Sequence, residues 1–210
     1  MYTPESFKVN ELAELHALIR RHSFGLLLTV HEGGIAATHL PFMVDAERGA
    51  QGTLLAHMAR ANPHWQLFDG RCEALAVFTG AHAYISPSWY ESPVTVPTWN
   101  YMAVHAHGRP VIVEDKRRVR VILEQLVTIH EARLDPPWST AQADEYVDQQ
   151  LDYIVAFEIK IERLEGKFKL NQNRSRADRE GVVQALEDSD DPLQREMAER
   201  MRGLPEKTTK

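Results

Sequence analysis

The chain has 210 residues, of which 43% are hydrophobic and 26% are charged, and its formal net charge is −6. This composition is ordinary for a globular protein and excludes the disordered and fibrous classes. The negative charge also disfavours a protein that coats nucleic acid or anionic membrane through its overall field, so any contact with DNA has to be local.

Features that would place the chain in or across a membrane are missing from the sequence. No apolar run approaches the roughly 20 residues that a transmembrane helix needs, and the N-terminus MYTPESFKVNEL lacks the pattern of a signal peptide. The single cysteine, Cys72, excludes an intrachain disulfide and a two-cysteine zinc or redox site. We therefore expect a cytoplasmic protein that makes no membrane contact.

The first half of the chain predicts one helix followed by an antiparallel meander. Asn10 is a candidate N-cap for a helix that ends near His22, with leucines at helical spacing. From there to about Glu114, short β-rich runs alternate with turn residues. Along residues 35–44 both faces of the expected strand are partly apolar, as in a barrel that is covered by helices.

The second half predicts helices around one further strand. Asp115 is a candidate cap for a second helix, and Ser139 opens a short third one. Residues 153–164 alternate as a single strand that closes the barrel, and Ser175 and Asp191 open two C-terminal helices. We expect an α+β fold that is mainly β, an antiparallel barrel with flanking helices.

The familiar catalytic motifs are missing: the sequence contains no GxGxxG, no P-loop, no GxSxG and no HExxH. His105 and His107 form the best local pair for a metal ion, because they share one strand face. No third ligand is placed by the sequence. We therefore expect no metal site.

The segment LLAHMARANPHW, residues 54–65, suits a phosphate group. An expected strand ends in His57, Arg60 and Asn62, and Asn62–Pro63 then caps a helix. Arginine supplies a fixed fork of donors, and a helix N-terminus presents free backbone N–H groups to an anion. The alternative is a plain strand-to-helix turn with an arginine on the surface.

Residues 84–101, YISPSWYESPVTVPTWNY, concentrate aromatic side chains among prolines and hydroxyl groups. Aromatic faces with polar groups nearby suit a planar, partly polar ring system. The alternative is an aromatic cluster that fills a core or a dimer interface.

Six blocks together resemble the PaiB-like FMN-binding family, a branch of the FMN-binding split barrels that includes pyridoxamine-phosphate oxidases and flavin reductases. The blocks are MYTPESF, ATHLPF, LLAHMARANPHW, AYISPSWY, VPTWNYMAVHAHG and GKFKLNQNRSRADREGV, and they run nearly from end to end. The resemblance implies a split β-barrel domain over residues 1–170 and a C-terminal helical extension over residues 171–210. It also implies FMN as cofactor, a homodimer with flavin sites at the subunit interface, and a role as a negative transcriptional regulator.

The resemblance implies FMN-binding residues position by position. The strand with Thr38, His39 and Leu40 resembles the one that lines the isoalloxazine ring, and the turn with His57, Met58, Arg60 and Asn62 resembles the phosphate-binding turn. Further contacts are implied for Trp89, Trp99 and Asn100, and for Lys167, Lys169, Asn171 and Gln172 on the C-terminal side. Oxidase members carry more Arg and Lys at the phosphate turn than Arg60 alone provides, so oxidase chemistry is not implied.

Three functions remain open at this stage. A flavin-dependent regulator would contact DNA through the basic stretch 160–179, but acidic residues interrupt that stretch and no helix-turn-helix is legible. An FMN-dependent oxidoreductase or flavin reductase would leave the redox step to the cofactor, so no acid or base need be visible. Haem binding on the same barrel would need an axial ligand such as His39, His57 or His107.

Overall fold

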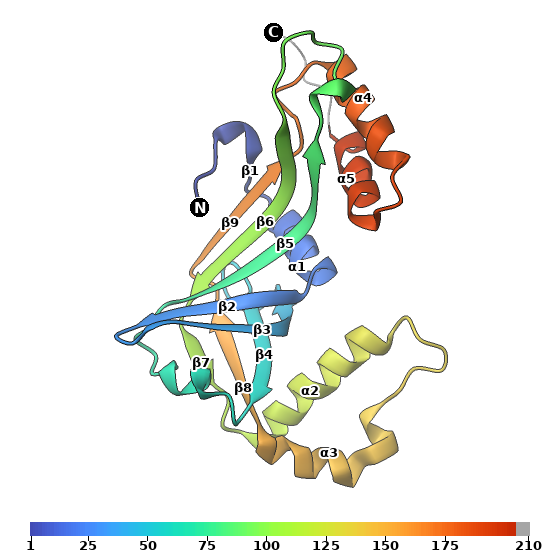
Figure 1. Ribbon diagram of the computed structural model, residues 1–210. Coiled ribbons are helices and arrows are strands. Elements are labelled where there is room, and N and C mark those ends of the chain that lie inside the picture. Colours follow the sequence, from blue (N-terminus) through green and yellow to red (C-terminus); the bar gives the residue numbers. More distant parts are fainter. Residues whose placement is uncertain (205–210) are drawn as a thin grey trace. The chain divides into compact units, whose positions relative to one another are not determined.

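The computed structural model describes residues 1–204 (Figure 1). The α-helices are α1 (Leu12–Arg21), α2 (Lys116–Glu131), α3 (Asp144–Gln150), α4 (Arg176–Glu187) and α5 (Pro192–Arg202). The strands are β1 (Lys8–Val9), β2 (Phe24–His31), β3 (Gly34–Asp45), β4 (Thr53–Ala59), β5 (Ala74–Ile85), β6 (Thr98–Gly108), β7 (Pro110–Ile112), β8 (Ile154–Lys160) and β9 (Arg163–Lys169). Short 3₁₀ helices are η1 (Glu5–Phe7), η2 (Pro63–Leu67), η3 (Pro87–Trp89), η4 (Thr140–Ala143) and η5 (Leu151–Tyr153).

The strands hydrogen-bond in the order β1-β9-β6-β5-β2-β3-β4-β8-β7. The pairings of β2 with β3 and β5, and of β4 with β3 and β8, are all antiparallel. The expected α+β class with a mainly antiparallel sheet is therefore confirmed. Within residues 1–204, no helix combines the length and the apolar character that crossing a membrane requires.

The chain divides into two compact units, and each is described by itself. The first unit comprises Met1–Glu11, Thr79–Val104 and Glu165–Lys210, and the second comprises Leu12–Phe78 and His105–Leu164. The boundary between them passes along β5, β6 and β9, so both units contain parts of these strands. The domain boundary expected at residue 170 stays a prediction.

The core of the second unit forms because β3 alternates as the sequence predicts. Leu40, Phe42 and Val44 are 3%, 2% and 6% exposed, whereas the residues between them are not buried. The Phe42 ring meets the Phe78 ring edge-on, with 5.3 Å between their centroids. Side chains from both strands therefore fill one interior, as the period of two residues along a strand requires.

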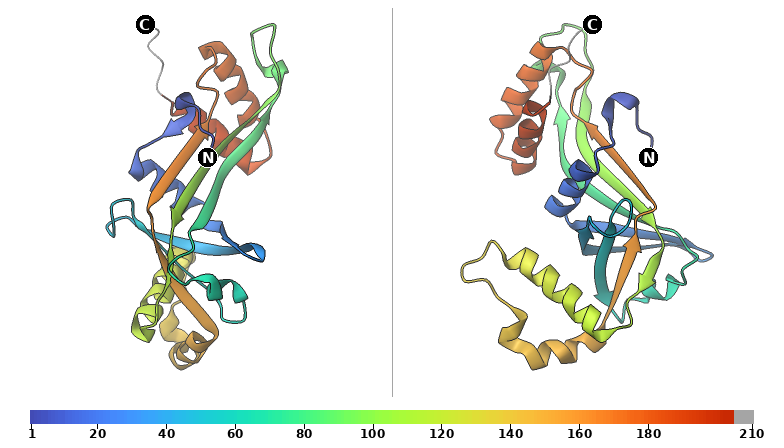
Figure 2. Two further views of the ribbon diagram at one scale, coloured as in Figure 1. Left: turned by 90° about the vertical axis from the view of Figure 1, so that its left-hand side faces the viewer. Right: turned by 180° about the vertical axis from the view of Figure 1, so that it is seen from behind.

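Helix α2 packs on the face of β4 that carries Leu55, in the same unit. Asp115 caps the helix by accepting a hydrogen bond from the backbone N of Arg117, as predicted. The apolar stripe of α2 then packs against β4, β8 and η5. The cluster comprises Leu55, Val119, Ile122, Leu126, Leu151 and Ala156. Figure 2 shows α2 and α3 from two further sides.

In the first unit, helices α4 and α5 pack side by side (Figures 1 and 2). Their caps follow the sequence signals, since Ser175 accepts from the backbone N of Asp178 and Asp191 from that of Leu193. Helix α4 also approaches η3 closely. A Cβ on Gly181 would lie 2.2 Å from the Trp89 carbonyl oxygen, so only glycine fits there.

Three local expectations were wrong in detail. Residues 153–164 form β8 and the start of β9, with a break after Lys160, because the backbone N of Ile161 leaves the ladder and bonds to the Gly52 carbonyl. Ser139 makes no side-chain cap bond, and the helix it was expected to open begins as the 3₁₀ turn η4. The helix that follows Asn62 is likewise the 3₁₀ helix η2.

Candidate functional site

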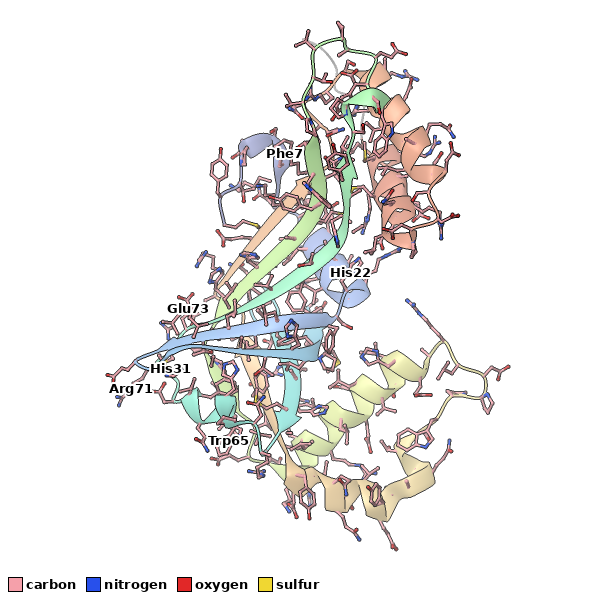
Figure 3. All side chains as sticks on the ribbon, in the orientation of Figure 1. Phe7, His22, His31, Trp65, Arg71 and Glu73 are labelled. Atoms are coloured by element: carbon pink, nitrogen blue, oxygen red, sulfur yellow. The ribbon has the colours of Figure 1, made fainter. Side chains whose placement is uncertain are left out.

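A pocket of about 380 Å³ opens in the second unit between β3 and η2. Its volume lies within the roughly 300–1,000 Å³ that small-molecule sites occupy. Its lining comes from the end of β2, the first half of β3 and η2: His31, Ala36, Ala37, Thr38, Asn62, Pro63, His64, Gln66 and Leu67. Figure 3 labels His31 at the end of β2 and Trp65 on η2. The pocket therefore combines an apolar floor with a few amide, hydroxyl and imidazole groups.

His64 organises the polar side of this pocket. Its side chain is only 3% exposed. The ring nitrogen Nδ1 lies 2.8 Å from Thr38 Oγ1, and Nε2 lies 3.0 Å from Thr29 Oγ1. Both threonines are on inward positions of paired strands, so β2 and β3 hold the imidazole between them.

Asn62 completes the network and fixes its direction. Its Oδ1 accepts a hydrogen bond of 3.0 Å from the backbone N of His64, which caps η2. Because the oxygen faces the helix, the amide nitrogen Nδ2 faces the strand and donates to Thr38 Oγ1 at 3.2 Å. The cap that the sequence predicted thus orients a pocket side chain as well.

Burial lowers the pKa of His64 below its ordinary value, and the nearby His31 imidazole lowers it further. Both causes disfavour a positive charge on the ring. His64 is therefore a neutral hydrogen-bonding group near pH 7, and it positions its neighbours without taking up a proton.

Of the residues expected along β3, the structure brings only Thr38 into the pocket lining. Leu40 is buried in the core of the second unit. His39 is exposed on the opposite strand face, where its ring stacks on Phe24 with 6.2 Å between centroids. Neighbouring side chains on one strand point to opposite faces, and the His39 ring therefore lies away from Thr38.

Of the residues expected in the phosphate-binding turn, Asn62 lines the pocket and the others do not. Met58 is buried at 4% exposure. His57 lies on the strand face of Leu55, its Nδ1 is buried without a hydrogen-bond partner among the described residues, and burial lowers its pKa. The Arg60 guanidinium donates to two backbone carbonyls, those of Asp152 at 2.7 Å and Ile154 at 2.8 Å.

The remaining expected residues belong to the first unit, where several have structural partners. Asn100 is fully buried, and its Nδ2 contacts Met201 Sδ at 3.4 Å. Lys167 is buried, donates to the Tyr2 carbonyl at 3.1 Å and lies 5.1 Å from the Tyr101 ring centroid.

The other members of this set differ in exposure. Trp99 is 55% exposed, and its ring meets that of Tyr84 edge-on at 6.0 Å. Gln172 closes a local turn by accepting from the backbone N of Leu170, and Trp89 ends η3. Lys169 donates to the Trp99 carbonyl, and Asn171 to the Tyr90 hydroxyl. Whether any of these residues contacts FMN stays a prediction.

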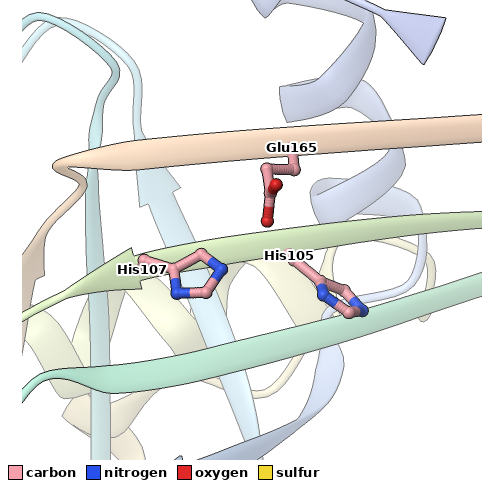
Figure 4. Close-up of side chains that lie close together, drawn as sticks. All are labelled: His105, His107 and Glu165. Carbon is pink, nitrogen blue, oxygen red and sulfur yellow. The ribbon is translucent and has the colours of Figure 1, made fainter. Parts of the chain in front are cut away.

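His105 and His107 lie on one face of β6, as the strand period predicts (Figure 4). Their ring centroids are 6.5 Å apart. The Nδ1 of His107 lies 2.9 Å from the Arg163 guanidinium and 3.4 Å from a Glu73 carboxylate oxygen. Glu165, also labelled in Figure 4, belongs to the first unit and accepts from the N-terminal ammonium at 3.0 Å. That the chain holds no metal stays a prediction.

Residues 1–163 match the family described as "Putative FMN-binding domain". The chain is also 34% identical over 201 residues to the "Protease synthase and sporulation protein PAI 2" of Bacillus subtilis, with 96% of each chain covered. The chain belongs to the PaiB-like FMN-binding family. Its cofactor is FMN.

Solved structures show that this PaiB-like chain has the fold of the flavin-binding split barrels. A conserved hypothetical protein from Mycobacterium tuberculosis is 14% identical, with a TM-score of 0.59 over 82% of this chain and 92% of that one. The flavocytochrome Anf3 from Azotobacter vinelandii is 11% identical, with a TM-score of 0.57 over 77% and 69%. At these identities the likeness concerns the fold alone.

The chemistry of the pocket lining can be compared with that of FMN. Its apolar floor of alanine, proline and leucine and its hydroxyl and amide groups suit a flat ring with a polar edge. None of its lining residues is Lys or Arg. The pocket lining therefore offers no side-chain cation to a phosphate.

Three residues of this site, His64, Thr29 and His31, were not predicted from the sequence. His64 stood inside the segment that was singled out, two residues after the capping asparagine. An asparagine N-cap accepts a hydrogen bond from the backbone N two residues further along, so the cap expected at Asn62 was a local signal for His64. Thr29 carried no such signal, because its partner lies 35 residues away in the sequence.

Proposed function

We propose that the protein is an FMN-binding homodimer that acts as a regulator and binds flavin in the pocket between β3 and η2. The observation that carries this proposal is the network of Thr38, Asn62 and His64, which presents oriented polar groups above an apolar floor. When bound, FMN supplies redox chemistry. The residues of the network bind and orient the ring, and burial keeps His64 neutral.

The regulatory role is preferred to catalysis because of the family relative, and the pocket lining is compatible with it. It has no carboxylate, and both nitrogens of its buried histidine are occupied by threonine hydroxyls. Such a lining suits a bound cofactor, and because flavin redox chemistry needs no protein acid or base, it does not by itself separate regulation from catalysis. The Bacillus subtilis relative carries the name "Protease synthase and sporulation protein PAI 2", and the reference to sporulation in that name supports a regulatory role.

A homodimer is supported by an apolar face of the sheet in the second unit. Phe24, Val30 and Ile35 are 68%, 70% and 69% exposed, and Val30 and Ile35 are partners in the β2–β3 register. Leu26 and Leu28 lie between them on the same face. We name this surface the β2–β3 face. A contiguous apolar patch of this kind marks an interaction site, and a second copy covers it with an identical patch about a two-fold axis.

The dimer also addresses the missing phosphate partner. The pocket lining lacks Lys and Arg, so the site needs a cation from elsewhere. We infer from the family resemblance that a second protomer completes the flavin site; the β2–β3 face does not argue for this, because Thr29 and Thr38 lie on the opposite face of the sheet.

Direct DNA binding through residues 160–179 has little support. Lys167 is buried, Arg163 contacts His107, and Arg176 pairs with Glu180 at 2.6 Å. These three cations are therefore engaged within the protein, and a regulatory effect through a partner molecule fits better than a basic DNA-binding surface.

FMN titration of the purified protein, followed by flavin absorption and fluorescence, tests the proposal. We expect one FMN per protomer, and sedimentation that returns a dimer. Steady oxidation of NADH or NADPH by the FMN-loaded protein would favour the alternative, an FMN-dependent oxidoreductase or flavin reductase. A protein that binds no FMN would refute the assignment of this pocket.

A further inference from the structure

The hydroxyl of Thr38 is a hub whose partners can be followed bond by bond. It is within hydrogen-bond distance of His64 Nδ1 and of Asn62 Nδ2, and it lies in the lining of the pocket. A hydroxyl has one proton to donate and two lone pairs that accept. Whether the hydroxyl proton or a lone pair of Thr38 faces the pocket depends on which nitrogen of His64 carries its proton.

The buried hydroxyl of Thr29 determines which nitrogen of His64 carries the proton. It is 1% exposed, and within residues 1–204 the partner of its hydroxyl is His64 Nε2, at 3.0 Å. If Nε2 carried the proton, it would donate to Thr29, and the Thr29 O–H would be buried with nothing to receive it. A buried donor without an acceptor is strongly disfavoured. Thr29 therefore donates to Nε2, and the His64 proton lies on Nδ1.

The remaining bonds then follow in order. The Nδ1–H of His64 donates to Thr38 Oγ1, and the Asn62 amide, turned by its cap bond, donates to the same oxygen. Both lone pairs of Thr38 are thus used. Its own proton has no partner among these groups and is available on the pocket side.

We propose that His64 is a positioning residue, held as the Nδ1–H tautomer, that turns the Thr38 hydroxyl into a hydrogen-bond donor to the pocket. The group it recognises is an acceptor atom, a carbonyl oxygen or an unprotonated ring nitrogen, on the edge of a planar ligand. Oxidised isoalloxazine carries such acceptors along its polar edge, so the identity of the ligand rests on the function proposed above. The tautomer does not, because it follows from the protein alone.

The tautomer is tested first, on protein without FMN. Long-range proton–nitrogen correlation spectra of protein labelled with ¹⁵N-histidine distinguish the two neutral forms, and His64→Gln assigns the signals by their loss. At pH 7.5 we expect a protonated Nδ1 and an unprotonated Nε2. A ring protonated on Nε2, or on both nitrogens, would overturn the inference.

The donor role is tested second, by FMN titration. Thr38→Val keeps the shape of the side chain and removes the hydroxyl, so we expect the Kd for oxidised FMN to rise roughly 2- to 12-fold. Thr38→Ser keeps the hydroxyl and serves as the variant that retains affinity, even if the valine variant folds poorly. Thr128→Val, on the exposed side of α2, is the matched control.

The outcomes separate the two proposals. If the wild-type protein binds no FMN, the proposed function fails, while the tautomer still stands or falls on the spectra. If FMN binds and Thr38→Val and Thr38→Ser have the wild-type Kd, the flavin site stands and the donor role of Thr38 is wrong.

Discussion

Arg60 donates from its Nε to the backbone oxygen of Asp152 at 2.7 Å, and so ties the end of β4 to η5. A second bond of 2.8 Å runs from Nη2 to the Ile154 carbonyl. The residue that the family resemblance implies for the phosphate is therefore also a structural clamp, although its Nη1 has no protein partner among the described residues. Replacement of Arg60 is therefore expected to change both the stability of the fold and the affinity for FMN.

We expect Arg60→Ala to lower the free energy of unfolding by about 1 kcal/mol, because a net hydrogen bond is worth about 0.5–1.5 kcal/mol and this side chain is exposed. Urea unfolding without FMN measures that loss, and FMN titration shows whether affinity falls as well. Arg20→Ala, on the surface of α1, controls for the lost charge. Wild-type FMN affinity in a stable Arg60→Ala variant would exclude the phosphate role.

Leu40→Ala removes a core side chain that is 3% exposed. We expect the free energy of unfolding to fall by about 2–5 kcal/mol, because truncation of a buried leucine loses apolar contact and leaves a cavity. Denaturant unfolding measures the change. FMN affinity at low temperature, where the variant is still folded, should stay near that of the wild type, and a specific loss there would place Leu40 in the flavin site.

Asp178 makes the first unit sensitive to acid. Its buried carboxylate accepts from the backbone N and the hydroxyl of Ser92, at 2.9 and 2.8 Å, and the backbone bond is the main cause that lowers its pKa below the ordinary 3.8. A lowered folded pKa stabilises the protein above about pH 4, and this contribution is lost as pH falls through the folded pKa. Asp178→Asn should flatten the acid limb of thermal stability against pH, with Glu32→Gln, in the exposed turn between β2 and β3, as the surface control. An unchanged limb would contradict this assignment.

The lowered pKa of His64 predicts a second dependence of stability on pH, at higher pH than that of Asp178. Its folded pKa lies below 6.5, so the unfolded chain binds more protons in the window below that value. Stability is therefore fully present above about pH 6.5 and declines as pH falls through 6.5 towards the folded pKa. We expect His64→Gln to be less sensitive in that window, as recorded by thermal melts from pH 8 to 5.

The companion control for this window is His57→Gln. Burial lowers the pKa of His57 as well, so the His57→Gln substitution should remove a separate part of the decline in stability as pH falls. If neither variant alters the decline, groups other than these two buried histidines are responsible for it.

Val30→Lys tests the dimer. Val30 is 70% exposed on the β2–β3 face, so the substitution should leave folding intact but place a charge in each half of a two-fold interface. Sedimentation should return a monomer, and FMN affinity should fall with it if the second protomer completes the site. Val111→Lys, on β7 at 54% exposure, should remain dimeric. A dimeric Val30→Lys protein would rule out this face.

Local patterns in the sequence determined much of the fold. The caps at Asp115, Ser175 and Asp191 lie where the signals predicted, because a cap involves groups only two or three residues apart. The alternation along β3 likewise predicted that Leu40, Phe42 and Val44 share the buried face, since the period of a strand is a property of the backbone. Family blocks in the sequence also identified FMN correctly.

The site itself was decided only by tertiary structure. The same alternation that buries Leu40 turns His39 away from Thr38, and the reach of Arg60 to Asp152 spans 92 residues of sequence. Thr29 and His64 carry no mutual signal along the chain, yet the register of β2 on β3 brings Thr29 and Thr38 to the same face, and η2 then sets His64 between them. Strand pairing depends on contacts between distant segments, so a single sequence cannot show which polar side chains will meet.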